Sequence, residues 1–103
     1  MSNYDIILCG PIIGIPDYRE RFAIALVNVR RKHIQEGTKR QKIWNPAVLQ
    51  EDMPKEWYII QSFNAIFSSP NATLVMLKGW ELDSKSKAEH ALGLFLGRKV
   101  EEL

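Results

Sequence analysis

Two glycines and two prolines stand close together in the segment CGPIIGIPDYRERF, which runs from Cys9 to Phe22. Gly10 and Gly14 have no Cβ, so the backbone at these positions can approach a ligand closely. A helix is expected to begin directly beyond, and the free N–H groups of its first turn attract a phosphate or a carboxylate. The segment therefore predicts an anion-binding loop, unless its glycines serve only to turn the chain. Its spacing matches neither the dinucleotide-binding fingerprint nor the P-loop.

One aromatic residue is a candidate for stacking on a base, and metal-ligating side chains are few. Trp80 follows Gly79 at the end of the clearest apolar run, where an indole can cover a base by stacking or plug the end of a sheet. His33, His90 and the single Cys9 show no metal-ligand spacing, so we expect neither a metal site nor a cofactor. Cys9 ends a predicted buried strand, which favours packing over a nucleophilic role.

A basic stretch between Arg30 and Lys42 holds six lysine and arginine side chains within thirteen residues. Cations near the C-terminus of a helix interact favourably with its dipole, which favours a solvated helix end. Contact with the phosphates of a nucleotide or a nucleic acid is the alternative. Single-strand binding also needs interleaved aromatic residues, and only Trp44 lies near, so a nucleic-acid partner is not expected.

The elements that must position these residues alternate between strands and helices. Apolar runs predict strands over residues 6–9, 42–44, 72–77 and 99–101. Apolar residues at helical spacing predict helices over about 17–37, 54–70 and 83–97. This order predicts an α/β protein, a small Rossmann-like or flavodoxin-like three-layer sandwich whose parallel sheet of four to five strands has helices on both faces.

Composition limits the classes of function that remain. A chain of 103 residues predicts one domain over residues 1–103, and a net charge of +2 is too small to indicate nucleic acid. No apolar run approaches the roughly 20 residues of a membrane helix, so we expect no membrane partner. One cysteine cannot form an internal disulfide, and the N-terminus lacks the pattern of a signal peptide. A cytoplasmic location, in a bacterial or phage-infected cell, is therefore expected.

The second predicted helix is apolar around much of its circumference. Its apolar residues include Trp57, Tyr58, Ile59, Ile60 and Phe63. A helix of this kind needs cover on more than one side. In a domain of this size a second subunit is a natural cover, so we expect a homo-oligomer.

Four short motifs follow one another along the chain. They are Cys-Gly-Pro-Ile-Ile-Gly-Ile-Pro-Asp-Tyr at residues 9–18, Asn45-Pro46, Gly79-Trp80-Glu81, and Glu89 nine residues after Trp80. Together they resemble DUF4406, a small phage and bacterial family related to the nucleoside 2-deoxyribosyltransferases. The resemblance runs nearly end to end, and it implies a nucleoside or nucleotide as the small-molecule partner.

The resemblance also implies a chemistry and a set of site residues. In the related transferases a carboxylate attacks C1′ of a deoxynucleoside, the base leaves, and the covalent intermediate passes to another base or to water. The resemblance places this nucleophile at Glu89. It implies ligand contacts at Gly10, Pro11, Ile12, Gly14, Tyr18, Asn45, Ser62, Trp80, Asp83 and Ser84.

Three residues depart from the family pattern at ligand-facing positions. Ser62 stands where the relatives have an aspartate, and a serine cannot act as the acid. Ile13 replaces a serine or threonine, and Lys85 replaces a glycine that lets the backbone approach the ligand. A partner subunit could supply the missing acid across an interface, from Glu51, Asp52 or Glu56.

Three functions remain open at this point. The first is a nucleoside- or nucleotide-binding protein that also cleaves or transfers at the N-glycosidic bond of a (deoxy)nucleoside monophosphate. The second is a catalytically inactive phage protein that binds or sequesters a nucleotide, such as a signalling nucleotide in host defence. The third is an interaction subunit on an enzyme fold, and the fold alone does not choose among them.

Overall fold

The computed structural model describes residues 3–35 and 41–103. Lys39 and Arg40 of the basic stretch lie outside the described residues, so the interpretation of that stretch stays a prediction. The elements, in chain order, are β1 (Ile6–Cys9), α1 (Tyr18–Gln35), β2 (Ile43–Trp44), the 3-10 helix η1 (Pro46–Val48), α2 (Lys55–Phe67), β3 (Thr73–Met76), the 3-10 helix η2 (Trp80–Leu82), α3 (Ser84–Phe95) and β4 (Lys99–Glu102).

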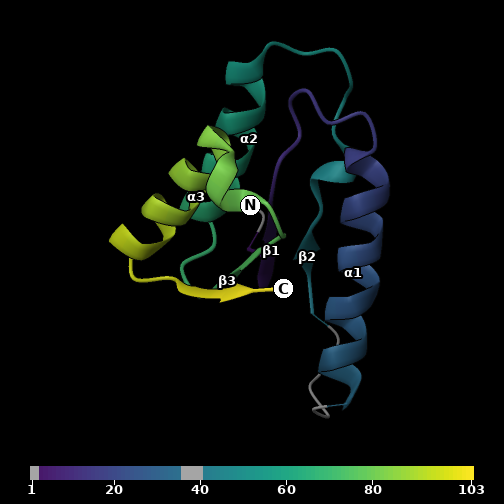
Figure 1. Ribbon diagram of the computed structural model, residues 1–103. Helices are drawn as coiled ribbons and strands as arrows, with labels where there is room; N and C mark the ends of the chain where they lie inside the picture. The colour runs from purple at the N-terminus through teal and green to yellow at the C-terminus, as the bar shows by residue number, and fades with distance from the viewer. Residues whose placement is uncertain (1–2, 36–40) are drawn as a thin grey trace.

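The four strands form one parallel sheet in the order β2-β1-β3-β4. Helix α1 covers one face of this sheet, and α2 and α3 lie together over the other (Figure 1). The structure is therefore the three-layer α/β sandwich that the order of elements predicted, with four strands.

The two central strands are apolar without alternation because both of their faces are covered. All four residues of β1 are buried, as are three of the four residues of β3. Ile6 and Leu8 pack on the α1 side with Phe22, whereas Ile7 and Cys9 pack on the other side with Ile66 of α2. Successive residues of β1 thus serve two separate cores.

The topology defines where a ligand site is expected. The chain leaves β1 for α1 on one face of the sheet and leaves β3 for α3 on the opposite face (Figure 1). In open α/β sheets such a change of side opens a crevice at the carboxyl ends of the two strands. The loops after β1 and β3 meet at this edge. Within the described residues, no helix is both long and apolar enough to span a membrane.

Candidate functional site

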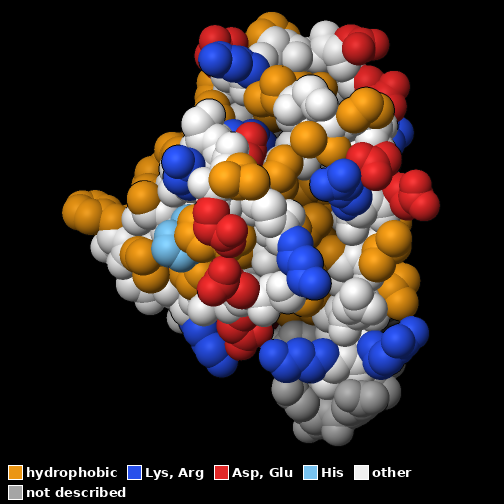
Figure 2. Space-filling view, in the orientation of Figure 1, with side chains coloured by type: hydrophobic (Ala, Val, Ile, Leu, Met, Phe, Trp, Pro, Cys, Tyr) orange, Lys and Arg blue, Asp and Glu red, His pale blue; other side chains and the backbone are white. Residues whose placement is uncertain are grey.

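A pocket of about 410 Å³ opens at the carboxyl end of the sheet, between the loop after β1 and the segment before α2. These two stretches lie side by side at the top of Figure 1. Acidic side chains gather over the start of α1 and the segment before α2, at the upper right of Figure 2. We call this cavity the loop pocket; it is lined by residues 12–16, Tyr18, residues 51–53, Lys55 and Tyr58.

The two glycines of the first loop have different physical roles. Gly14 adopts φ +75°, a left-handed conformation that favours glycine, and a Cβ there would meet no atom within 4 Å. Gly14 therefore turns the chain at the edge of the loop pocket. A Cβ on Gly10 would lie 2.9 Å from the Cβ of Leu77. The need for glycine at this second position comes from packing against the end of β3.

The opposite wall of the loop pocket is held by specific hydrogen bonds. The Tyr58 hydroxyl donates to the carbonyl of Gln50 at 2.9 Å and accepts from the N–H of Met53 at 3.3 Å. The guanidinium of Arg19 pairs with the Glu51 carboxylate at 3.1 Å. Asp52 has a left-handed backbone, with φ 60°. These contacts present two carboxylates to the loop pocket, those of Glu51 and Asp52.

A second cavity of about 210 Å³ lies between the first turns of α2 and α3. We call it the small pocket; its lining residues are Ile13, Lys55, Glu56, Ile59, Ser84, Lys85 and Ala88. It shares Ile13 and Lys55 with the loop pocket. Of the three acids that sequence reasoning offered, Glu51 and Asp52 line the loop pocket and Glu56 lines the small pocket.

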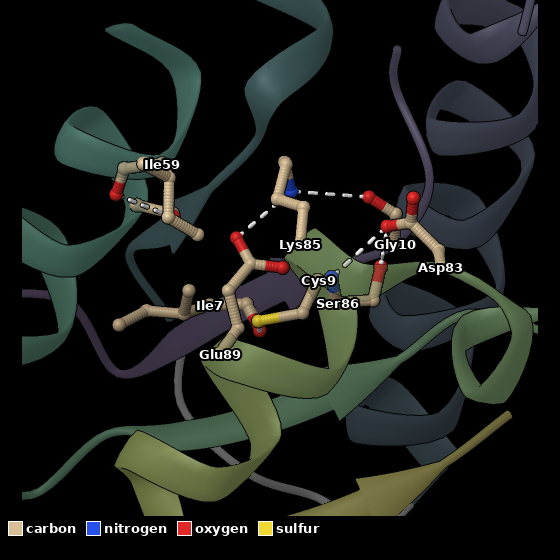
Figure 3. A network of polar contacts seen from close by, with 9 residues as sticks. Ile7, Cys9, Gly10, Ile59, Asp83, Lys85, Ser86 and Glu89 are labelled. Carbon is tan, nitrogen blue, oxygen red and sulfur yellow. Dashed lines mark hydrogen bonds and ion pairs between the residues drawn. The ribbon is translucent and has the colours of Figure 1, made fainter. Parts of the chain in front are cut away.

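Lys85 closes the route from the small pocket to Glu89. Its Nζ donates to Glu89 Oε2 at 2.9 Å and to the carbonyl of Gly10 at 3.2 Å (Figure 3). The two side chains are one helical turn apart on α3, and their exposed fractions are 7% for Lys85 and 0% for Glu89. The carboxylate that the resemblance implies as nucleophile is therefore enclosed by protein.

Burial dominates the electrostatics of Glu89. Desolvation raises its pKa above the ordinary value, and the nearby Lys85 ammonium offsets only part of this effect. The Ser62 hydroxyl lowers the same pKa further, although its own hydrogen bond goes to the carbonyl of Ile59 at 3.1 Å. Burial likewise raises the pKa of the Cys9 thiol, and the charge of Glu89 adds to that rise.

The second oxygen of the Glu89 carboxylate is not compensated by a hydrogen bond from the described residues. Glu89 Oε1 is buried and has no hydrogen-bond partner among the residues that the structure describes. A buried carboxylate oxygen without a donor is costly, which makes the pairing of Oε2 with Lys85 the main compensation for the charge. In this arrangement Lys85 and the surrounding protein hold the Glu89 carboxylate in place but do not present it to a ligand.

Three residues expected at the ligand make other contacts. Asn45 Oδ1 accepts from the N–H of Ala47 at 3.0 Å, which caps η1. Asp83 caps α3 by accepting from the N–H of Ser86 at 2.9 Å. The Trp80 ring stacks on His90 with centroids 4.2 Å apart, and its Nε1 donates to Glu102 Oε1 at 2.8 Å. Neither pocket is lined by Asn45, Trp80 or Asp83.

The structure thus divides the expected site residues into groups. Ile12, Gly14 and Tyr18 line the loop pocket, and Ser84 lines the small pocket. Ser62 and Glu89 are buried beneath them, and Pro11 is half-buried. Within the parts of the chain that the structure describes, no cluster of three or more His, Cys, Asp or Glu is placed to hold a metal.

Sequence reasoning missed three residues of the loop pocket, Met53, Lys55 and Tyr58. Met53 and Lys55 flank Pro54, which marks the start of α2, and Tyr58 lies in the first turn of that helix. The free N–H groups at a helix start were a usable signal. What sequence reasoning lacked was the knowledge that this helix start faces the first loop.

Comparison with known proteins adds a family and no function. Neither the curated proteins nor the solved structures give a match. A family model described as a domain of unknown function, DUF4406, matches residues 4–102, which is nearly the whole chain. The chain therefore belongs to the DUF4406 family.

Proposed function

We propose that the protein binds a nucleoside or a nucleotide in the loop pocket. The cavity of about 410 Å³ falls within the range of about 300–1,000 Å³ usual for small-molecule sites. It opens at the carboxyl end of the sheet, where the chain changes sides and where ligands of this fold class bind. The resemblance of the sequence motifs to the nucleoside 2-deoxyribosyltransferases suggests a nucleoside as the ligand class.

The lining of the loop pocket supports the same class of ligand. The Glu51 and Asp52 carboxylates can accept hydrogen bonds from sugar hydroxyls. Ile13 and the Tyr18 ring offer apolar surface to a base. Lys55 stands on the border with the small pocket, where its ammonium can pair with a phosphate.

We propose that the protein binds its ligand without cleaving it. The observation that supports the absence of cleavage is the pairing of Lys85 with Glu89. A carboxylate that attacks C1′ must reach the sugar, whereas Glu89 is 0% exposed and Lys85 stands between it and the small pocket. Ser62, in place of an aspartate, offers no acid. Sequestering or sensing a nucleotide therefore fits the site better than turnover does.

A thermal-shift screen tests both parts of the proposal. The purified protein is heated with nucleosides, mononucleotides, dinucleotides and cyclic nucleotides, and each mixture is then separated by chromatography. A ligand at a hundred times its Kd adds about 2.7 kcal/mol of stability. We expect a stabilising ligand that is recovered intact.

Two variants and one control locate the site. Glu51→Gln and Asp52→Asn remove the carboxylates, and asparagine tolerates the left-handed backbone at position 52. Both should abolish most of the ligand-induced rise in Tm, whereas Glu81→Gln, on the exposed part of η2, should leave it unchanged. A screen in which no nucleoside or nucleotide raises Tm contradicts binding. A ligand recovered as free base and sugar contradicts the absence of cleavage.

A further inference from the structure

The outer side of α2 is apolar although it faces solvent. Ile60, Phe63 and Phe67 follow one another at intervals of three and four residues, so they lie on one side of the helix. Ile60 is 52% exposed and Phe67 is 56% exposed, and the Phe63 and Phe67 rings pack edge to face. A surface helix ordinarily places its polar residues on this side.

The outer side of α3 continues this surface. Leu94 is 57% exposed and Phe95 is 86% exposed, and the exposed Ala91 lies one turn before Phe95. Ala88 lines the small pocket together with Ile59 of α2, so this side of α3 adjoins α2. Hydrophobic side chains show along the edge of the molecule formed by these helices in Figure 2. We call the surface the α2–α3 face; it comprises Ile60, Phe63, Phe67, Ala88, Ala91, Leu94 and Phe95.

The charges of both helices lie near their N-terminal ends. Residues 57–67 of α2 contain no lysine, arginine, aspartate or glutamate, and neither do residues 90–95 of α3. Depletion of charge together with enrichment in aromatic residues is the composition of the buried centre of a protein–protein interface. The exposed surface of a monomer seldom concentrates apolar side chains in this way.

We propose that a second copy of this chain covers the α2–α3 face, so that the protein is a two-fold homodimer. The exposed parts of Ile60, Phe67, Leu94 and Phe95 alone amount to on the order of 400 Å², about half of the roughly 800 Å² that each partner contributes to a standard interface. Phe63, Ala88 and Ala91, together with residues at the rim of the face, would have to supply the rest of a standard interface.

The face is also complementary to itself. A two-fold interface brings the same patch of each subunit against its copy, so it needs projections and depressions on one surface. Phe95, at the end of α3, is 86% exposed, and the small, exposed side chains of Ala88 and Ala91 precede it on the same side of the helix. Each phenylalanine can therefore lie over the alanines of the partner.

Dimerisation of this kind acts on the ligand site. The small pocket borders the α2–α3 face, because Ala88 belongs to both. A second copy docked on the face would therefore cover the edge of the small pocket. The dimer is proposed independently of ligand binding, because its evidence is the apolar surface and not the loop pocket.

Sedimentation velocity of the full chain at several concentrations tests the proposal. The wild type should sediment as a dimer that dissociates on dilution. The double variant Phe67→Gln with Phe95→Gln should raise the dimer Kd by at least about 30-fold, because exposed aromatic side chains at an interface centre carry most of its binding energy. Glutamine is a good helix former, so both helices should keep their far-UV circular dichroism.

A matched double variant serves as the control. Ile24 and Val48 are 55% and 82% exposed, and these exposed fractions are similar to those of Phe67 and Phe95. Both residues lie on the opposite side of the sheet, in α1 and η1. Ile24→Gln with Val48→Gln should leave the dimer intact. A wild type that stays monomeric at its highest soluble concentration overturns the proposal. The proposal is also overturned if the double variant of Phe67 and Phe95 remains a dimer, or if the control variant weakens the dimer by the same factor.

Discussion

The substitution Lys85→Met removes the cation from the buried pair while nearly keeping the volume of the side chain. In the wild type, Lys85 Nζ lies 2.9 Å from Glu89 Oε2 and 3.2 Å from the carbonyl of Gly10 (Figure 3). The variant leaves the Glu89 carboxylate buried without an opposite charge, and its Oε1 already lacks a partner among the described residues.

The expected loss of stability is large because the pair is almost completely buried. Removing one partner of a buried ion pair costs about 3–5 kcal/mol, and the exposed fractions of 7% and 0% leave little room for screening by water. A domain of this size has a free energy of unfolding of roughly 5–15 kcal/mol, so the variant should lose about a fifth of it or more. Its Tm should fall by more than about 10 °C.

The loss depends on pH in a defined direction. The pKa of Glu89 is raised in the folded protein because desolvation outweighs the effect of Lys85, and without Lys85 it rises further. A carboxyl group with a raised folded-state pKa favours folding while it is protonated, below an unfolded value of about 4.3, and this contribution disappears as the pH rises through the folded pKa. The deficit of the variant should therefore be smaller near pH 4 than near pH 7.

Urea unfolding of four proteins at both pH values measures these effects. Lys85→Met combined with Glu89→Gln should recover most of the stability near pH 7, because no buried charge is left. Lys87→Met, an exposed position on the same helix, should change stability by less than about 0.5 kcal/mol. Equal deficits at the two pH values, or a double variant as unstable as Lys85→Met alone, would refute the assignment of the loss to the unpaired carboxylate.

The remaining predictions concern the backbone around the site, and urea unfolding measures both. Gly10→Ala should lower the free energy of unfolding by about 1–3 kcal/mol, because its Cβ would lie 2.9 Å from the Cβ of Leu77. Gly14→Ala should lower it by only about 1 kcal/mol, because of the left-handed φ of +75°. A larger loss for Gly14→Ala than for Gly10→Ala would contradict this order. Asp83→Ala should cost about 1 kcal/mol by removing the cap of α3, with Asp83→Ser retaining most of the stability; equal losses for alanine and serine would show that the cap is not responsible.

The fold could be predicted because its local signals agree with one another. The strands β1 and β3 are continuous apolar runs, which suits strands buried on both faces, and their helices carry apolar residues at helical spacing. The short β2 has half-buried residues and a weak pattern, yet the order of elements placed it correctly in a parallel sheet.

The candidate site was predictable only in part, because a motif does not say where its side chains point. The Gly-Pro loop was correctly expected at the carboxyl edge of the sheet, and Ile12, Gly14 and Tyr18 line the pocket there. Asn45 and Asp83, in contrast, stand next to helix starts, and their side chains cap those helices. Either role was compatible with their positions in the chain.

The sequence by itself determined the class of fold, because the order of strands and helices follows from residue type and spacing. That Ser62 and Lys85 replace ligand-facing residues is what the family resemblance implied. The tertiary structure alone decided what Lys85 does. An ammonium on a long side chain can reach solvent or turn inward. Glu89 lies one turn along the same helix, but only the packing of α3 against β1 brings Lys85 to the carbonyl of Gly10 and buries the pair. The burial of this pair arises from residues distant along the chain, and it decides whether the Glu89 carboxylate is available for chemistry.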